Sequence, residues 1–142
     1  MSTRCVINFT NGNGTVAAKI YRHSNGYPDT EHGVLADLTR FFADVQAQTQ
    51  DTRFGDAPYL AAKYVVWQAR KNARHIVQGD VFKSSPSQAH RITFVSHADD
   101  RPLDFLSVGI VMEDPDDIEY VYTVKCNGVP PKVSYRTFKA SA

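Results

Sequence analysis

Alternating apolar and polar positions mark the amino-terminal part of the chain as β-structure. Residues 4–9 and 15–21 alternate with a period of two and flank a turn at residues 11–14, Asn-Gly-Asn-Gly. Asn-Gly pairs favour tight hairpins because both residues tolerate positive φ. The pattern therefore predicts a β-hairpin whose first strand turns its odd-numbered side chains to one face.

A period of three to four residues replaces this alternation in the middle of the chain. Over residues 33–48 the apolar side chains form one stripe, with Asp37 and Asp44 off it. This spacing predicts an amphipathic helix. A second helix is predicted to begin after Asp56, a good N-cap, with Pro58 in its first turn, where a missing N–H costs nothing.

The remaining chain returns to a period of two. Residues 105–112, 118–126 and 133–138 are predicted strands, and residues 76–82 and 91–96 also alternate. Strands on both sides of a helix pair favour an α+β fold. We expect an antiparallel sheet with a pair of helices inserted after the first β-hairpin. The order is ββααβββ, or ββααβββββ if the two further segments are strands.

Composition and charge narrow the class of protein. A chain of 142 residues, 42% hydrophobic and 22% charged, is expected to form one domain over residues 1–142 that buries a core without disulfides or metal. The net charge of +1 argues against a protein that binds duplex nucleic acid mainly by bulk charge. Cys5 and Cys126 are expected to be buried free thiols in a reducing cytoplasm. The sequence shows no signal peptide or membrane span.

Signatures of enzymes and cofactor sites are missing from the sequence. It has no phosphate-binding loop, no dinucleotide fingerprint, no Cys-x-x-Cys pair and no metal-ligand spacing of histidines. We therefore expect a protein that is not an enzyme and that uses no cofactor and no metal. The acidic run at residues 113–119 is expected to be a solvated hairpin tip.

Residues 21–28, Tyr-Arg-His-Ser-Asn-Gly-Tyr-Pro, form the densest group of candidate binding residues. Pro28 biases Tyr27 toward extended backbone, and Gly26 can take positive φ. Together with Asn25 they predict a stiff corner just before the first helix, whose amino-terminal amides suit an anion.

The chemistry of this corner has two interpretations. Arg22 can hold a phosphate through two parallel hydrogen bonds, and His23 or Tyr27 can stack on a base. Alternatively, Arg22 and His23 pair with acidic neighbours and Tyr27 caps the core. A second candidate patch would combine arginine and aromatic side chains, which hold purines by stacking and cation–π contact. Its members are Arg53, Phe54, Arg91, Asp104 and Phe105.

The octet at residues 21–28 resembles that of a family of small phage and prophage proteins, Tyr-Arg-His-x-Asp-Gly-Tyr-Pro. Residues 33–38, 104–106 and 119–122 also match that family, whereas Asn25 replaces the usual Asp. Size, element order and phage character are similar to those of the phage Thoeris anti-defence proteins. Those proteins bind glycocyclic ADP-ribose without cleaving it, their relatives sequester cyclic oligonucleotides, and they assemble as homo-oligomers.

The resemblance implies a cytoplasmic homo-oligomer in the infected bacterial cell that sequesters a small cyclic nucleotide signal. Arg22, His23 and the following turn would then hold the phosphates, and the patch around Arg53 and Phe54 would hold adenine. Two other functions stay open. One is a phage inhibitor of a host defence protein, of the anti-CRISPR type, acting through residues 113–119. The other is a small nucleotide phosphoesterase that uses His23 as acid or base.

Overall fold

Residues 3–83 and 106–138 are described by the computed structural model, with side chains described outside residues 72–83. The predicted strand at 91–96 lies outside the described residues. The chain divides into two compact units, one of Met1–Tyr64 with Val108–Ala142 and one of Val65–Ser107.

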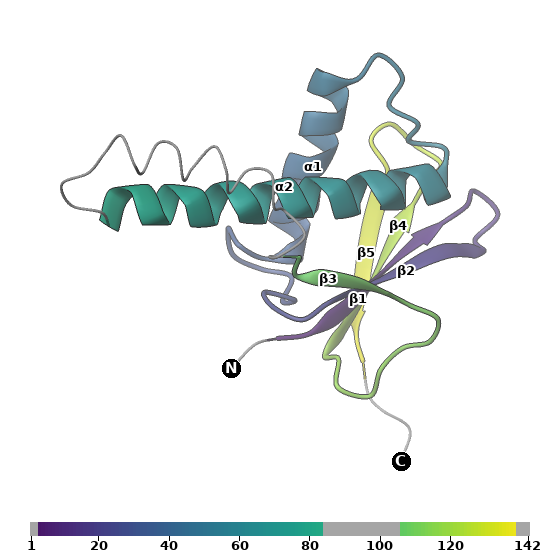
Figure 1. Cartoon of the computed structure of the whole chain (residues 1–142). Coiled ribbons are helices and arrows are strands. Elements are labelled where there is room, and N and C mark those ends of the chain that lie inside the picture. Colours follow the sequence, from purple (N-terminus) through teal and green to yellow (C-terminus); the bar gives the residue numbers. More distant parts are fainter. Residues whose placement is uncertain (1–2, 84–105, 139–142) are drawn as a thin grey trace. The chain divides into compact units, whose positions relative to one another are not determined.

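The first unit contains a five-stranded sheet in the order β3-β2-β1-β4-β5 (Figure 1). It also contains helix α1, Val34–Gln48, and the beginning of helix α2, Ala57–Lys83. The strands are β1 (Cys5–Thr10), β2 (Val16–Arg22), β3 (Val108–Val111), β4 (Tyr120–Lys125) and β5 (Lys132–Thr137).

The α+β class and the order ββααβββ are confirmed. The sheet is mixed rather than antiparallel, because β1 pairs with β4 in parallel while the other three pairings are antiparallel. The helices and the chain after them supply the long connection that a parallel pairing requires. The prediction of a strand at residues 76–82 is wrong, since α2 continues to Lys83. Each added helical residue gains a hydrogen bond, so a few β-branched side chains do not end a helix.

The β1–β2 turn and the amino-terminal cap of α2 lie at the positions that the sequence predicts. The β1–β2 turn closes with the Asn11 N–H bonded to the Thr15 carbonyl at 2.8 Å, and Gly14 has a φ of 89°. The Asp56 side chain accepts from the Tyr59 N–H at 3.4 Å, which caps α2 as predicted. Among the described residues, no helix combines the length and the apolar character needed to cross a membrane.

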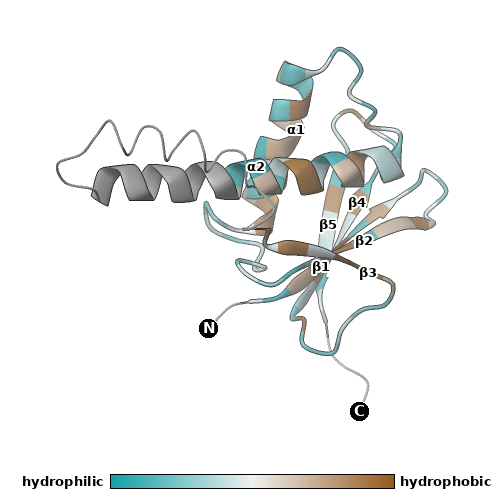
Figure 2. Cartoon of the chain, in the orientation of Figure 1, coloured by the Kyte–Doolittle hydropathy of each residue, from teal (hydrophilic) through white to brown (hydrophobic). Residues whose placement is uncertain are grey.

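The main core lies between the sheet and the helical residues of the first unit. Tyr64 contacts Phe9 of β1 with ring centroids 5.9 Å apart and Phe41 of α1 at 5.3 Å. Figure 2 shows apolar residues gathered along the strands and along one side of α1. These contacts fix α1 against the sheet face that carries the odd-numbered residues of β1.

The opposite face of the sheet has a smaller core made of Val6, Ile118 and Val121. The acidic run at residues 113–119 also lies on this face. It is not the predicted tip of a hairpin, because β2 and β1 separate β3 from β4 in the sheet. Its Asp114 pairs with Lys19 at 2.9 Å, and its Asp117 pairs with Arg4 at 3.4 Å. Two of its five acids thus form ion pairs, although Asp117 is exposed, as are Glu113, Asp116 and Glu119.

Candidate functional site

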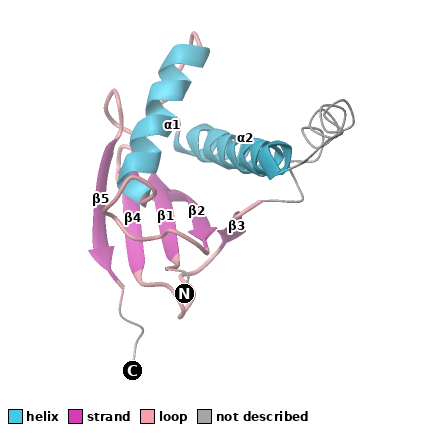
Figure 3. Cartoon of the chain, turned by 90° about the vertical axis from the view of Figure 1, so that its left-hand side faces the viewer, coloured by secondary structure: helices cyan, strands magenta, loops and turns pink. Residues whose placement is uncertain are grey.

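Residues 23–33 form the loop between β2 and α1, which runs in front of the sheet in Figure 3. The loop is fixed to the sheet at Gly26. The Gly26 N–H donates to the Thr3 carbonyl at 2.9 Å, and the Tyr122 hydroxyl donates to the Gly26 carbonyl at 2.6 Å. A Cβ added to Gly26 would lie 2.8 Å from the Thr3 oxygen and 3.0 Å from Cys5 Cβ. Glycine is required here for close approach. The positive φ expected at Gly26 is found instead at Asn25, at 54°.

Arg22 holds the two ends of this loop from inside the protein. Its Nε donates to the Ser24 carbonyl at 2.9 Å, and its Nη2 donates to the His32 carbonyl at 3.4 Å. Its Nη1 donates to Asp37 Oδ2 at 2.7 Å and to the Tyr64 hydroxyl at 3.1 Å. Only 5% of Arg22 is exposed. Arg22 therefore pairs with an acidic neighbour, the alternative that the sequence left open, and its guanidinium is not presented to solvent.

The prediction that Asp37 lies off the apolar stripe of α1 is wrong. Asp37 is completely buried, and the ion pair with Arg22 is what makes its burial tolerable, because an unpaired buried charge is very costly. Burial acts to lower the pKa of Arg22, but Tyr64 and Asp37 outweigh it and raise the pKa above its ordinary value. The Arg22 guanidinium therefore stays charged inside the protein.

Three predicted binding residues lie on the outer side of the same loop. His23 is exposed and has no hydrogen-bond partner among the described residues. Asn25 is exposed, and the half-buried Tyr27 donates its hydroxyl to Asn25 Oδ1 at 3.1 Å. The structure thus presents an imidazole, an amide and a phenol together on a loop that is anchored beneath by Arg22 and Gly26.

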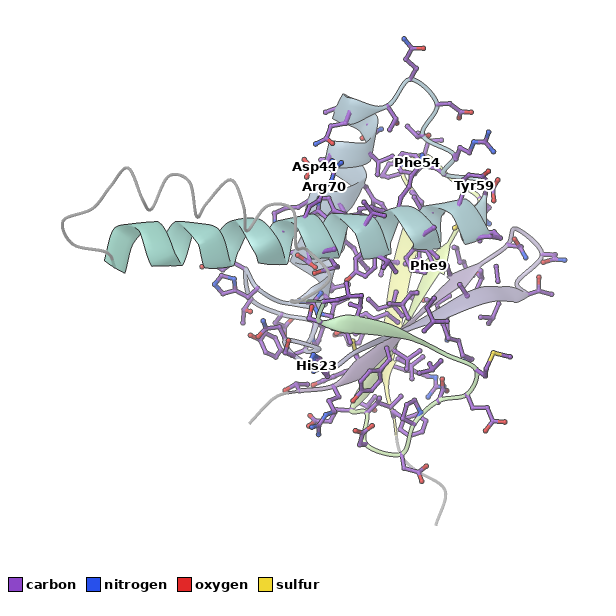
Figure 4. The ribbon with its side chains drawn as sticks, in the orientation of Figure 1. Phe9, His23, Asp44, Phe54, Tyr59 and Arg70 are labelled. Atoms are coloured by element: carbon purple, nitrogen blue, oxygen red, sulfur yellow. The ribbon has the colours of Figure 1, made fainter. Side chains whose placement is uncertain are left out.

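The second predicted patch is not joined to this loop by any contact among the described residues. Phe54 is 2% exposed and packs edge-on against Phe42 at 5.8 Å, so its ring belongs to the core. Arg53 lies 4.5 Å above the ring of Tyr59. Figure 4 shows Phe54 and Tyr59 on the opposite side of Phe9 from His23. The other members, Arg91, Asp104 and Phe105, lie outside the described residues.

A cluster of three tyrosines beside the loop was not predicted as a site. The ring of Tyr122 lies 5.7 Å from Tyr135 and 6.3 Å from Tyr120, and Tyr120 lies 6.3 Å from Tyr135. Tyr135 is 47% exposed, whereas Tyr122 is fully buried. Alternation along β4 predicts that Tyr120 and Tyr122 share a face. The partner Tyr135 depends on the β4–β5 register, which the sequence alone does not supply.

The reactive groups near the loop are a buried thiol and an exposed imidazole. Burial raises the pKa of the Cys5 thiol to about 12, although Arg22 acts to lower it, so the thiol stays protonated and unreactive. Cys5 and Cys126 are both buried free cysteines, as expected. No residue in the described part of the chain orients the His23 imidazole as an acid–base residue requires. The described part of the chain also has no group of three or more His, Cys, Asp or Glu residues able to hold a metal.

Comparison with known proteins identifies no relative of this chain. A scan against protein-family models, a search of curated proteins and a search of solved structures each give no significant match.

Proposed function

We propose that this protein binds and sequesters a small cyclic nucleotide immune signal, such as glycocyclic ADP-ribose or a cyclic oligonucleotide, without cleaving it. The observation that carries the proposal is the anchored loop at residues 23–33. Bonds from Arg22 and Tyr122 hold its backbone, and the loop leaves His23 and Asn25 exposed and Tyr27 half-buried. In this role the protein acts as a homo-oligomer in the cytoplasm of an infected bacterial cell.

A fixed loop favours tight binding of a small ligand. A flexible loop would lose conformational entropy on binding, and a pre-organised loop avoids most of that cost. Arg22 contributes by positioning, since its bonds to Ser24 and His32 hold both ends of the loop in place. A sequestering protein requires such affinity because it acts by retaining its ligand.

The first turn of α1 supports an anionic ligand. Gly33 is the N-cap and makes no side-chain cap bond. The Val34 N–H donates to the Tyr27 carbonyl at 3.0 Å, but the N–H groups of Leu35 and Ala36 have no acceptor among the described residues. Unpaired amides at a helix amino terminus favour phosphate. The side chains of the loop and these amides thus suit a phosphate-bearing ligand better than a neutral one.

The proposal is tested by asking what the protein does to candidate ligands. The purified protein is incubated with glycocyclic ADP-ribose or a cyclic oligonucleotide, free ligand is removed, and the protein is heat-denatured. Recovery of intact ligand is the expected result. Recovery of a cleaved product would indicate a phosphoesterase, and no depletion of any nucleotide would favour an inhibitor that binds a host protein. Native mass spectrometry before and after heating identifies any ligand that copurifies.

A further inference from the structure

The tyrosine cluster and the anchored loop lie side by side on the helix-facing side of the sheet. In the strand register, Cys5 lies opposite Tyr120 and Ile7 lies opposite Tyr122. Gly26 lies close to both β1 and β4, since a Cβ on it would lie 3.0 Å from Cys5 Cβ and its carbonyl accepts from the Tyr122 hydroxyl. The loop therefore crosses the sheet directly beside the tyrosines, although β4 and β5 come about 100 residues later in the chain than the loop.

The three rings differ in a way that suits a stacking surface. Tyr122 is fully buried, and its hydroxyl is bonded to the loop, so its ring is immobile. Tyr135 packs on it with an interplanar angle of 36° and leaves 47% of its surface exposed. Tyr120 is half-buried and meets Tyr135 edge-on at 67°. A fixed ring thus supports an exposed aromatic ring at the edge of the sheet.

An exposed tyrosine on an edge strand does not by itself indicate a ligand. Edge strands are more often protected by charged side chains, and β5 has two, Lys132 and Arg136. Side chains alternate between the faces of a strand, so these cations lie on the face opposite Tyr135. The helix-facing side of β5 thus combines an open aromatic ring with a neighbouring loop that bears an amide, an imidazole and a phenol.

We propose that Tyr135, supported by Tyr120 and Tyr122, stacks on the adenine base of the bound nucleotide while the loop at residues 23–33 contacts its phosphates. This inference rests on the proposed function and adds a base-binding site to it. Flat aromatic rings suit this role because every nucleobase has a π-face, and one stacked base is worth a measurable share of the affinity.

The test distinguishes the contribution of the Tyr135 aromatic ring to binding from the contributions of its size and its hydroxyl. Glycocyclic ADP-ribose binding is measured by calorimetry for the wild-type protein and for Tyr135→Phe and Tyr135→Leu. We expect Leu to weaken binding at least about tenfold, equivalent to about 1.4 kcal/mol, and Phe to remain within about twofold of wild type. The adenine protons of the bound ligand should shift upfield in the NMR spectra of the wild-type protein and Tyr135→Phe, and not in that of Tyr135→Leu.

Tyr59→Leu is the matched control, because Tyr59 is a 55% exposed tyrosine whose ring contacts Arg53 instead of the cluster. It should bind like wild type. Equal binding by folded Tyr135→Leu, or an equal loss in Tyr135→Phe and Tyr135→Leu, would overturn the stacking role while leaving the proposed function intact. A wild-type protein that binds no nucleotide would instead overturn the proposed function, and the base site with it.

Discussion

The Arg22 guanidinium donates to the Asp37 carboxylate at 2.7 Å, with the Arg22 side chain 6% exposed and the Asp37 side chain 0% exposed. The pair joins the last residue of β2 to the first turn of α1, so it spans the loop that carries His23, Asn25 and Tyr27. A buried ion pair of this kind does little for net stability but fixes one arrangement of the chain. Here the arrangement it fixes is that of the candidate binding loop.

Removing one member of this pair should destabilise the fold. Asp37→Asn leaves the Arg22 charge buried without its partner, and the expected loss is about 3–5 kcal/mol in the free energy of unfolding. Urea denaturation followed by circular dichroism measures it. Arg40→Ala is the control, since Arg40 is half-exposed, lies 3.7 Å from the same carboxylate and should cost less than about 1 kcal/mol. Equal losses in the two variants would contradict the role given to Arg22.

A second prediction concerns the contact between Gly26 and β1. Gly26→Ala puts a Cβ 2.8 Å from the Thr3 oxygen, so the loop or the strand must move, at a cost of about 1–3 kcal/mol. Gly55→Ala is the matched control. It meets nothing within 4 Å and should leave stability unchanged or raise it by up to about 1 kcal/mol. Thermal unfolding of both variants checks this, and a neutral Gly26→Ala would show that the loop is not anchored there.

Local patterns predicted most of the elements, and tertiary pairing decided the candidate site. The hairpin turn at Gly14 and the cap at Asp56 follow from neighbouring residues, so the sequence located them. The inward direction of Arg22 depends on Asp37, fifteen positions away in the chain. The apolar stripe of a helix does not show that a neighbouring polar residue, here Asp37, is buried in an ion pair with a residue from another element. The tyrosine cluster likewise depends on a strand register that no periodicity contains.

The buried thiol of Cys5 predicts how stability changes at alkaline pH. Its pKa rises from an ordinary 9.0 to about 12 in the fold, so above pH 9 the unfolded chain loses a proton that the folded chain keeps. Stability should therefore fall as pH rises, by about 1.4 kcal/mol per pH unit for one such group. Urea denaturation between about pH 8 and pH 10 should show a smaller slope for Cys5→Ala. An unchanged slope would indicate that Cys5 ionises normally in the fold.

The exposed imidazole of His23 provides the most direct test of the loop as a binding surface. His23→Ala removes a side chain with no partner among the described residues, so the free energy of unfolding should change by less than about 0.5 kcal/mol. Binding of glycocyclic ADP-ribose should weaken about fivefold or more, equivalent to about 1 kcal/mol, as expected for loss of one polar ligand contact.

The loop provides its own control for this variant. His32 is also exposed on residues 23–33 but lies 3.2 Å from Glu31, whose carboxylate would repel a phosphate. His32→Ala should therefore bind the ligand at least as well as wild type. Calorimetric titration of the two variants side by side distinguishes a contact specific to His23 from a general effect of losing an imidazole on this loop. Weaker binding by both would assign the effect to that general loss, and unchanged binding by His23→Ala would remove this side of the loop from the site.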